Sequence, residues 1–119
     1  SLQMNQHIHG NSPHPAVASS LHNIGAVYQE QGEYTKAMKY YEESLQMKRH
    51  IHGNNPHPAV ASSLGQIGCF YQQLGEYTKA MKYFNECLAI QRQVFSNDTH
   101  PEVARTFRNI AICQKQMSN

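Results

Sequence analysis

The chain has 119 residues, of which 39% are hydrophobic and 15% charged, and its formal net charge is +2. This length suits one small array rather than several domains. No apolar run approaches the ~20 residues of a membrane span. The net charge is too small to indicate a nucleic-acid partner by itself. The three cysteines lack the spacing of a disulfide framework. They therefore favour a reducing compartment, which predicts a cytoplasmic protein.

In chain order, the pattern predicts the tail of a helix followed by five further helices. The predicted helices cover 15–31, 33–50, 58–74, 76–94 and 101–117. Pro15 suits a first helical turn, where its missing N–H is not needed, and Gly32 suits a left-handed helix end. Ser1 aligns with Ser44, in the middle of a predicted helix, so we expect the chain to be a segment of a longer protein.

One nonapeptide, Gly32–Tyr40, returns unchanged as Gly75–Tyr83. The two surrounding segments of 43 residues, 1–43 and 44–86, differ at 11 positions, and a third, diverged copy begins at Cys87. A fixed period of this size predicts stacked supersecondary units that cannot bury their apolar faces alone. We therefore predict a single array over 1–119, divided into a preceding tail (1–10), two repeats (11–53 and 54–96) and the first helix of a third repeat (97–119).

The repeated positions carry a resemblance to a known family. They are Leu21, Ile24, Gly25, Tyr28, Gly32, Tyr34, Ala37, Tyr41, Ser44 and Leu45, with their counterparts in the second copy. This spacing resembles the tetratricopeptide repeat. The unit exceeds the usual length of about 34 residues and opens with His-Pro-x-Val-Ala, as in the long repeats of kinesin light chains. The resemblance implies an all-α, right-handed superhelical solenoid of antiparallel helical hairpins, acting as a protein-interaction module in an adaptor or scaffold.

The resemblance also implies that the first helix of each hairpin lines a concave groove that binds an extended peptide. The groove residues predicted in this way are Ser19, His22, Asn23, Ala26, Glu30, Ser62, Gln66, Cys69, Gln73, Arg105, Arg108, Asn109 and Lys115. In long-repeat relatives, an amide at the positions of Asn23, Gln66 and Asn109 typically holds the peptide backbone, a task that suits a group with donors and an acceptor. The alternative is three solvated amides.

Four of the 11 differences between the first two copies fall in this groove, at 22/65, 23/66, 26/69 and 30/73. They indicate either a diversified binding surface on an identical scaffold or neutral drift at exposed sites. Positive charge increases along the array and gathers at Arg105, Arg108 and Lys115, which predicts an acidic and partly apolar partner. Two alternatives remain open: a structural segment that associates weakly head-to-tail, and an appendage to an effector or enzymatic domain outside this chain.

No catalytic constellation emerges, so we predict that the chain is not an enzyme. Cys69, Cys87 and Cys113 stand where the other copies have Ala26, Ser44 and Phe70. We interpret them as packing or groove residues. Histidines form two similar clusters: His7, His9 and His14, and His50, His52 and His57. Such clusters can bind zinc or copper, but residues two apart point to different sides of a helix. We therefore predict no metal and no cofactor, and expect the histidines before the helix-opening prolines to cap or pack.

Overall fold

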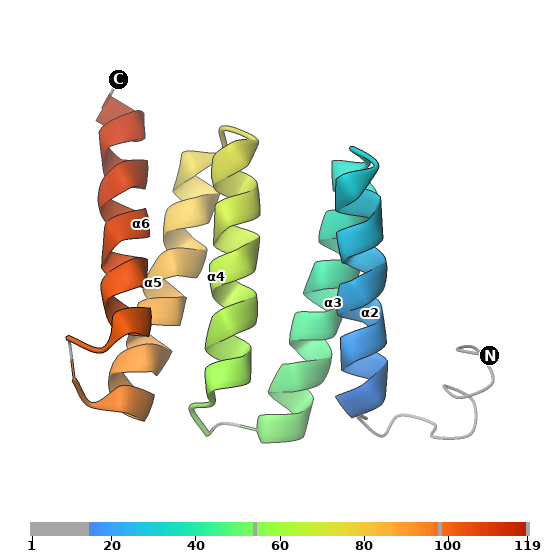
Figure 1. The fold of residues 1–119 in the computed structure, drawn as a ribbon, viewed down its shortest axis with the longest axis horizontal. Coiled ribbons are helices and arrows are strands. Elements are labelled where there is room, and N and C mark those ends of the chain that lie inside the picture. The colour runs from blue at the N-terminus through green and yellow to red at the C-terminus, as the bar shows by residue number, and fades with distance from the viewer. Residues whose placement is uncertain (1–14, 54, 98, 119) are drawn as a thin grey trace. The chain divides into compact units, whose positions relative to one another are not determined.

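The computed structural model describes residues 15–53, 55–97 and 99–118, and within them the chain is helical with short connections (Figure 1). The helices are α2 (Pro15–Glu30), α3 (Tyr34–His52), α4 (Pro58–Gln73), α5 (Tyr77–Phe95) and α6 (Pro101–Ser118). The described residues contain no strand. These bounds agree closely with those predicted from the sequence, whereas the predicted tail at 1–10 lies outside the described residues.

The chain divides into two compact units, unit 1 (Ser1–Asn54) and unit 2 (Asn55–Asn119). In unit 1, α2 packs against α3 as a helical hairpin. In unit 2, α4 packs against α5 in the same way, and α6 then packs on α5 with a smaller contact to α4. The hairpins predicted from the repeated nonapeptide are thus present in both units.

Histidine and proline together start two helices of unit 2, α4 and α6. His57 lies at the N-cap of α4, where its Nδ1 accepts a hydrogen bond from the backbone N–H of Ala59 at 3.0 Å. His100 does the same for α6, accepting from the backbone N–H of Glu102 at 3.1 Å. A following proline needs no partner for its nitrogen. The capping role expected for these histidines is therefore present at both helices.

The bend of each hairpin is built from backbone geometry. Gly32 and Gly75 have φ values of 80° and 79°, a region that side chains with a Cβ rarely occupy. The next residue then donates its N–H back across the turn, from Glu33 to the carbonyl of Tyr28 and from Glu76 to that of Tyr71, both at 2.9 Å. This is the arrangement that satisfies the last carbonyls of a helix. Neither glutamate side chain caps the next helix.

The core of each hairpin forms where the two helices approach closely at a glycine. A Cβ at Gly25 would lie 2.9 Å from Cδ1 of Tyr41, and one at Gly68 would lie 2.7 Å from Cε1 of Phe84. Both ring residues are buried. The buried apolar residues around them are Val17, Ala18, Leu21, Ala37, Met38 and Leu45 in unit 1, and Val60, Ala61, Leu64, Ile67, Phe70 and Ala80 in unit 2.

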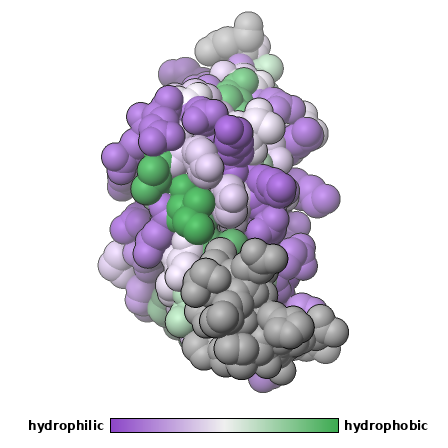
Figure 2. All heavy atoms as spheres, turned by 90° about the vertical axis from the view of Figure 1, so that its right-hand side faces the viewer, coloured by the Kyte–Doolittle hydropathy of each residue, from purple (hydrophilic) through white to green (hydrophobic). Residues whose placement is uncertain are grey.

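Some large apolar side chains lie outside the core, among them Tyr34 and Val27 in unit 1. Tyr34, one of the repeated positions, is 44% exposed because it stands at the first residue of α3. Val27 on α2 is 54% exposed. In the view of Figure 2, a small hydrophobic area is bordered by hydrophilic side chains.

Candidate functional site

The predicted groove residues lie on α2, α4 and α6, the first helix of each repeat. All of them are exposed or half-buried, and none belongs to the core. The exposed members are Ser19, Asn23, Glu30, Ser62, Gln66, Gln73, Arg105, Arg108 and Lys115, and the half-buried ones are His22, Ala26, Cys69 and Asn109. The side chains are thus available to a partner, those of α2 in unit 1 and the others in unit 2.

In unit 2, the structure brings side chains of α4 and α6 together. The Nδ2 amide of Asn109 donates to Sγ of Cys69 at 3.9 Å, a weak contact. About two helical turns further along α6, Gln72 donates from Nε2 to Oε1 of Gln116 at 2.7 Å. These two contacts join residues 40 or more positions apart in the chain. They make one continuous surface from the two first helices of unit 2.

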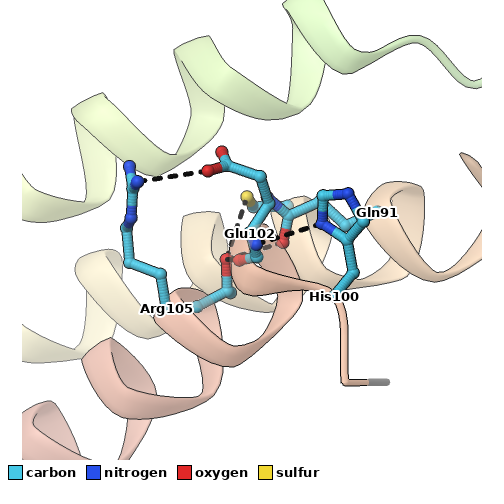
Figure 3. Close-up of polar contacts among 6 residues, drawn as sticks. Gln91, His100, Glu102 and Arg105 are labelled. Carbon is cyan, nitrogen blue, oxygen red and sulfur yellow. Dashed lines mark hydrogen bonds and ion pairs between the residues drawn. The ribbon is translucent and has the colours of Figure 1, made fainter. Parts of the chain in front are cut away.

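The positive charge of this surface is smaller than the sequence indicated. Arg105 pairs with Glu102, whose Oε1 lies 3.1 Å from Nη2 of the guanidinium (Figure 3). Sequence reasoning counted Arg105 as a free cation because it did not place a carboxylate one helical turn before it. Arg108 and Lys115 are exposed. They and the partly neutralised Arg105 share a face of α6 with Ile112, which is 46% exposed.

A buried polar contact holds α6 in position on α5. The hydroxyl of Thr106 donates to Oε1 of Gln91 at 2.6 Å and lies 3.7 Å from Sγ of Cys87 (Figure 3). Gln91 and Thr106 are both buried, with exposed fractions of 5% and 4%. Sequence reasoning missed this contact. The signal was present in the third copy, where Gln91 replaces Lys48 and Thr106 replaces Ser63.

The comparison with protein families decides what kind of array this is. The model of the tetratricopeptide repeat matches residues 1–50, 16–93 and 59–119. The chain belongs to the tetratricopeptide repeat family. The all-α tetratricopeptide solenoid predicted from the sequence is therefore confirmed. Tetratricopeptide repeats are in general protein–protein interaction modules and are typically non-enzymatic.

The fold is similar to that of solved structures of kinesin light chain-like repeats. A kinesin light chain-like protein of Podospora anserina with nearly identical tetratricopeptide-like repeats matches 95% of the chain with 21% sequence identity and a TM-score of 0.76. A variant of that protein with one substituted residue matches 98% of the chain at 19% identity and a TM-score of 0.74. The chain spans 53% and 56% of their lengths, about half. No curated protein matches.

Unit 1 of the tetratricopeptide array carries a cluster of ionisable side chains between α2 and α3. The ring of His22 lies against that of Tyr41, with centroids 5.1 Å apart and planes inclined by 43°. The Tyr41 hydroxyl donates to Oε1 of Gln29 at 2.6 Å. Burial lowers the pKa of His22 below 6.5, and the nearby Lys48 ammonium lowers it further. Burial raises the pKa of Tyr41, and the Glu30 carboxylate adds to this shift.

The cysteines of the array are free, and their surroundings do not activate them. Cys87 and Cys113 are buried and Cys69 is half-buried. Burial raises the pKa of all three thiols, which disfavours the reactive thiolate. Cys87 and Cys113 are thus packing residues, and Cys69 lies half-buried on α4.

The described residues form no group of three or more metal-binding side chains. Of the histidine clusters, His7, His9 and His14 lie outside the described residues. In the described part of the chain, no helix is long and apolar enough to cross a membrane.

Proposed function

We propose that this tetratricopeptide array binds an extended segment of a partner protein along the surface of its first helices. The observation that carries this proposal is the joining of α4 and α6 in unit 2 by the contacts Asn109–Cys69 and Gln72–Gln116. Exposed Gln66 and half-buried Asn109 then offer amide groups on one surface. An amide can donate to and accept from a peptide backbone at once, so it suits capture of an extended strand of any sequence.

The chemistry of α6 indicates what side chains the partner carries. Arg108 and Lys115 supply exposed positive charge, and Ile112 supplies an exposed apolar side chain beside them. We therefore propose an acidic and partly apolar segment as the ligand. Because Arg105 forms an ion pair with Glu102, we expect Arg108 and Lys115 to contribute more to the attraction of an acidic segment.

Substitution of the amides tests the capture of the peptide backbone. We expect Asn23→Ala, Gln66→Ala and Asn109→Ala together to abolish binding of peptides selected from a displayed library on the wild-type array. Asn85→Ala and Gln93→Ala, which remove exposed amides from α5, form the matched control and should leave binding unchanged. Equal binding by both variants would contradict the proposal.

The electrostatic part of the proposal is tested separately, by varying the salt concentration. Exposed charges are screened over about 10 Å at ~0.1 M salt, so the association rate of a selected acidic peptide should fall as salt rises. Arg108→Gln with Lys115→Gln should remove most of this dependence, whereas Lys82→Gln, on the exposed side of α5, should not. An association rate that does not respond to salt would rule out the acidic partner.

A second candidate function, weak self-association, is favoured by the apolar side chains of α6. Phe107, Ile112 and Met117 are 38%, 46% and 49% exposed, and exposed apolar patches commonly mark association sites. Sedimentation should then show concentration-dependent association that Phe107→Ser weakens. A pure monomer at high micromolar concentration would exclude this candidate.

The cellular setting of the array belongs to the same proposal. We place it in the cytoplasm, on the ground of its three free cysteines. An accompanying effector or enzymatic domain is compatible with a chain that spans about half of its structural neighbours. Fluorescence localisation of the protein in cells tests the first point, and the mass of the protein isolated from its natural source tests the second.

A further inference from the structure

In unit 1, one buried residue of the second helix is held by three positions of the first helix. This residue is Tyr41 of α3. Its ring lies 5.1 Å from that of His22, measured between centroids, and its hydroxyl donates to Oε1 of Gln29 at 2.6 Å. The ring also fills the space beside Gly25, where a Cβ would lie 2.9 Å from Cδ1 of Tyr41. We call these three positions of a first helix, His22, Gly25 and Gln29 in α2, the socket.

The residue in the socket changes together with the socket itself. In unit 2, Gly65 replaces His22, and Phe84, which has no hydroxyl, replaces Tyr41. Gln72, the counterpart of Gln29, bonds to a side chain of α6 instead. The second helix thus has a polar atom where the socket offers a hydrogen-bond partner, and none where it does not.

The third first helix, α6, has a socket of another kind. Its residues are Arg108, Ala111 and Lys115. Arg108 and Lys115 are exposed, and neither forms an ion pair with another of the described residues. The methyl group of Ala111 occupies the space that Gly25 leaves for the ring of Tyr41. A side chain narrower than tyrosine that carries a carboxylate, such as glutamate, suits a socket of this shape and charge.

The apolar face around this socket is uncovered. Within unit 2, α6 packs on α5 and to a smaller extent on α4 (Figure 1). Three apolar positions that the second helix buries in α2 and α4 are exposed in α6. They are Ala18, Leu21 and Gly25 in α2, Ala61, Leu64 and Gly68 in α4, and Ala104, Phe107 and Ala111 in α6. The two complete hairpins therefore show what kind of element covers such a face, namely an antiparallel helix.

We propose that this face of α6 docks an amphipathic helix of a partner protein, with a glutamate of that helix in the socket of Arg108, Ala111 and Lys115. The partner helix lies on α6 as α3 lies on α2, and its carboxylate pairs with the two cations. A second copy of this chain does not fit, because its second helices carry Tyr41 and Phe84 at this place. Both of these rings are buried in their own hairpins. The site goes beyond the proposed groove and does not depend on the amides there.

Peptides derived from α3 test the site. The probe is a peptide with the sequence of residues 33–52 and with Tyr41→Glu, and the comparison peptides carry Tyr41→Gln or the unchanged tyrosine. Each is titrated into the full chain at low salt. NMR of the methyl groups of Ala104 and Ala111 locates binding on this face. The Tyr41→Glu peptide should bind about fivefold more tightly than the Tyr41→Gln peptide, the effect of two partly exposed ion pairs.

Substitutions in the array make the test specific. Arg108→Gln with Lys115→Gln should remove the difference between the Tyr41→Glu and Tyr41→Gln peptides. Lys82→Gln, on the exposed side of α5, is the matched control and should preserve it. Ala111→Gly should strengthen binding of the unchanged peptide, because it restores the space for the tyrosine ring.

Each contrary result overturns a stated part of the proposal. Equal binding of the Tyr41→Glu and Tyr41→Gln peptides would rule out the cationic socket, and an unchanged Ala111 methyl signal with every peptide would rule out the docking face. Preference for the unchanged peptide would assign the face to a second copy of the chain. If the Tyr41→Glu peptide binds this array but not the protein purified from its natural source, that protein covers the face itself and the separate partner is wrong. The groove is tested through its amides, so either proposal can fail while the other stands.

Discussion

The phenol of Tyr41 donates a hydrogen bond to Oε1 of Gln29 at 2.6 Å, and this contact has no equivalent in the second hairpin. Phe84 stands at the corresponding place and has no hydroxyl group. Gln72, the counterpart of Gln29, instead donates to Gln116 on α6 at 2.7 Å. The Tyr41 hydroxyl thus accompanies a change in the partner of this glutamine. Gln29 forms a hydrogen bond within its own hairpin, whereas Gln72 joins the first helices α4 and α6.

Tyr41→Phe should destabilise unit 1 without changing its packing. A hydrogen bond of this kind contributes about 0.5–1.5 kcal/mol, and the half-buried Gln29 can recover some of that by bonding to water. We therefore expect a loss in the lower part of that range, measured as the free energy of unfolding in urea. Phe84 shows that the ring alone fits the site. An unchanged unfolding free energy would mean that the bond contributes nothing.

In unit 2, replacing either of two glycines of α4 by alanine should change the stability of the fold, in opposite directions at the two positions. A Cβ at Gly68 would lie 2.7 Å from Phe84, so Gly68→Ala should cost about 1–3 kcal/mol through overpacking. A Cβ at Gly65 would lie 3.6 Å from Sγ of Cys87, an ordinary contact. Gly65→Ala should therefore stabilise the helix by up to about 1 kcal/mol. Thermal unfolding of the two variants checks the pair, and destabilisation by both would contradict it.

The contact between Thr106 and Gln91 should be needed to hold α6. Thr106→Val keeps the shape but leaves the buried Gln91 oxygen without its donor, which costs about 1–3 kcal/mol. Thr106→Ser retains the hydroxyl and should lose less. Hydrogen exchange of the amides of α6 is the measurement, because the loss should appear there first. Equal exchange in both variants would assign the effect to packing instead.

Much of the fold could be predicted because the features that carry it are local and repeated. The prolines that open the helices, the glycines at the bends and the period of the buried residues need no knowledge of the tertiary structure. The charge of the candidate site could not be read so directly. Arg105 looked free until the structure paired it with Glu102. The contact between the rings of His22 and Tyr41 was missed because the two residues come from different helices and meet only where those helices pack.

The histidine cap of α4 gives a prediction about the start of that helix. His57→Ala removes the acceptor for the N–H of Ala59 and should cost about 1 kcal/mol, the usual effect of losing an N-cap. His57→Asn supplies another acceptor at the same position and should restore most of this stability. Urea unfolding of the two variants checks the cap. A similar loss in both would show that the imidazole contributes by packing rather than by capping.

The last prediction concerns pH and unit 1. Because the pKa of His22 lies below 6.5 in the folded chain, the unfolded chain binds this proton more readily. The stability associated with neutral His22 is therefore fully present above pH 6.5 and is lost as the pH falls toward the lower, folded-state pKa. The urea midpoint of the wild type should drop between about pH 7.5 and 5.5 by more than that of His22→Asn, since the other histidines titrate in both. Lys48→Gln should reduce the drop as well, because the Lys48 charge is the second cause of the shift. A drop of the same size in all three proteins would show that His22 is not the group responsible.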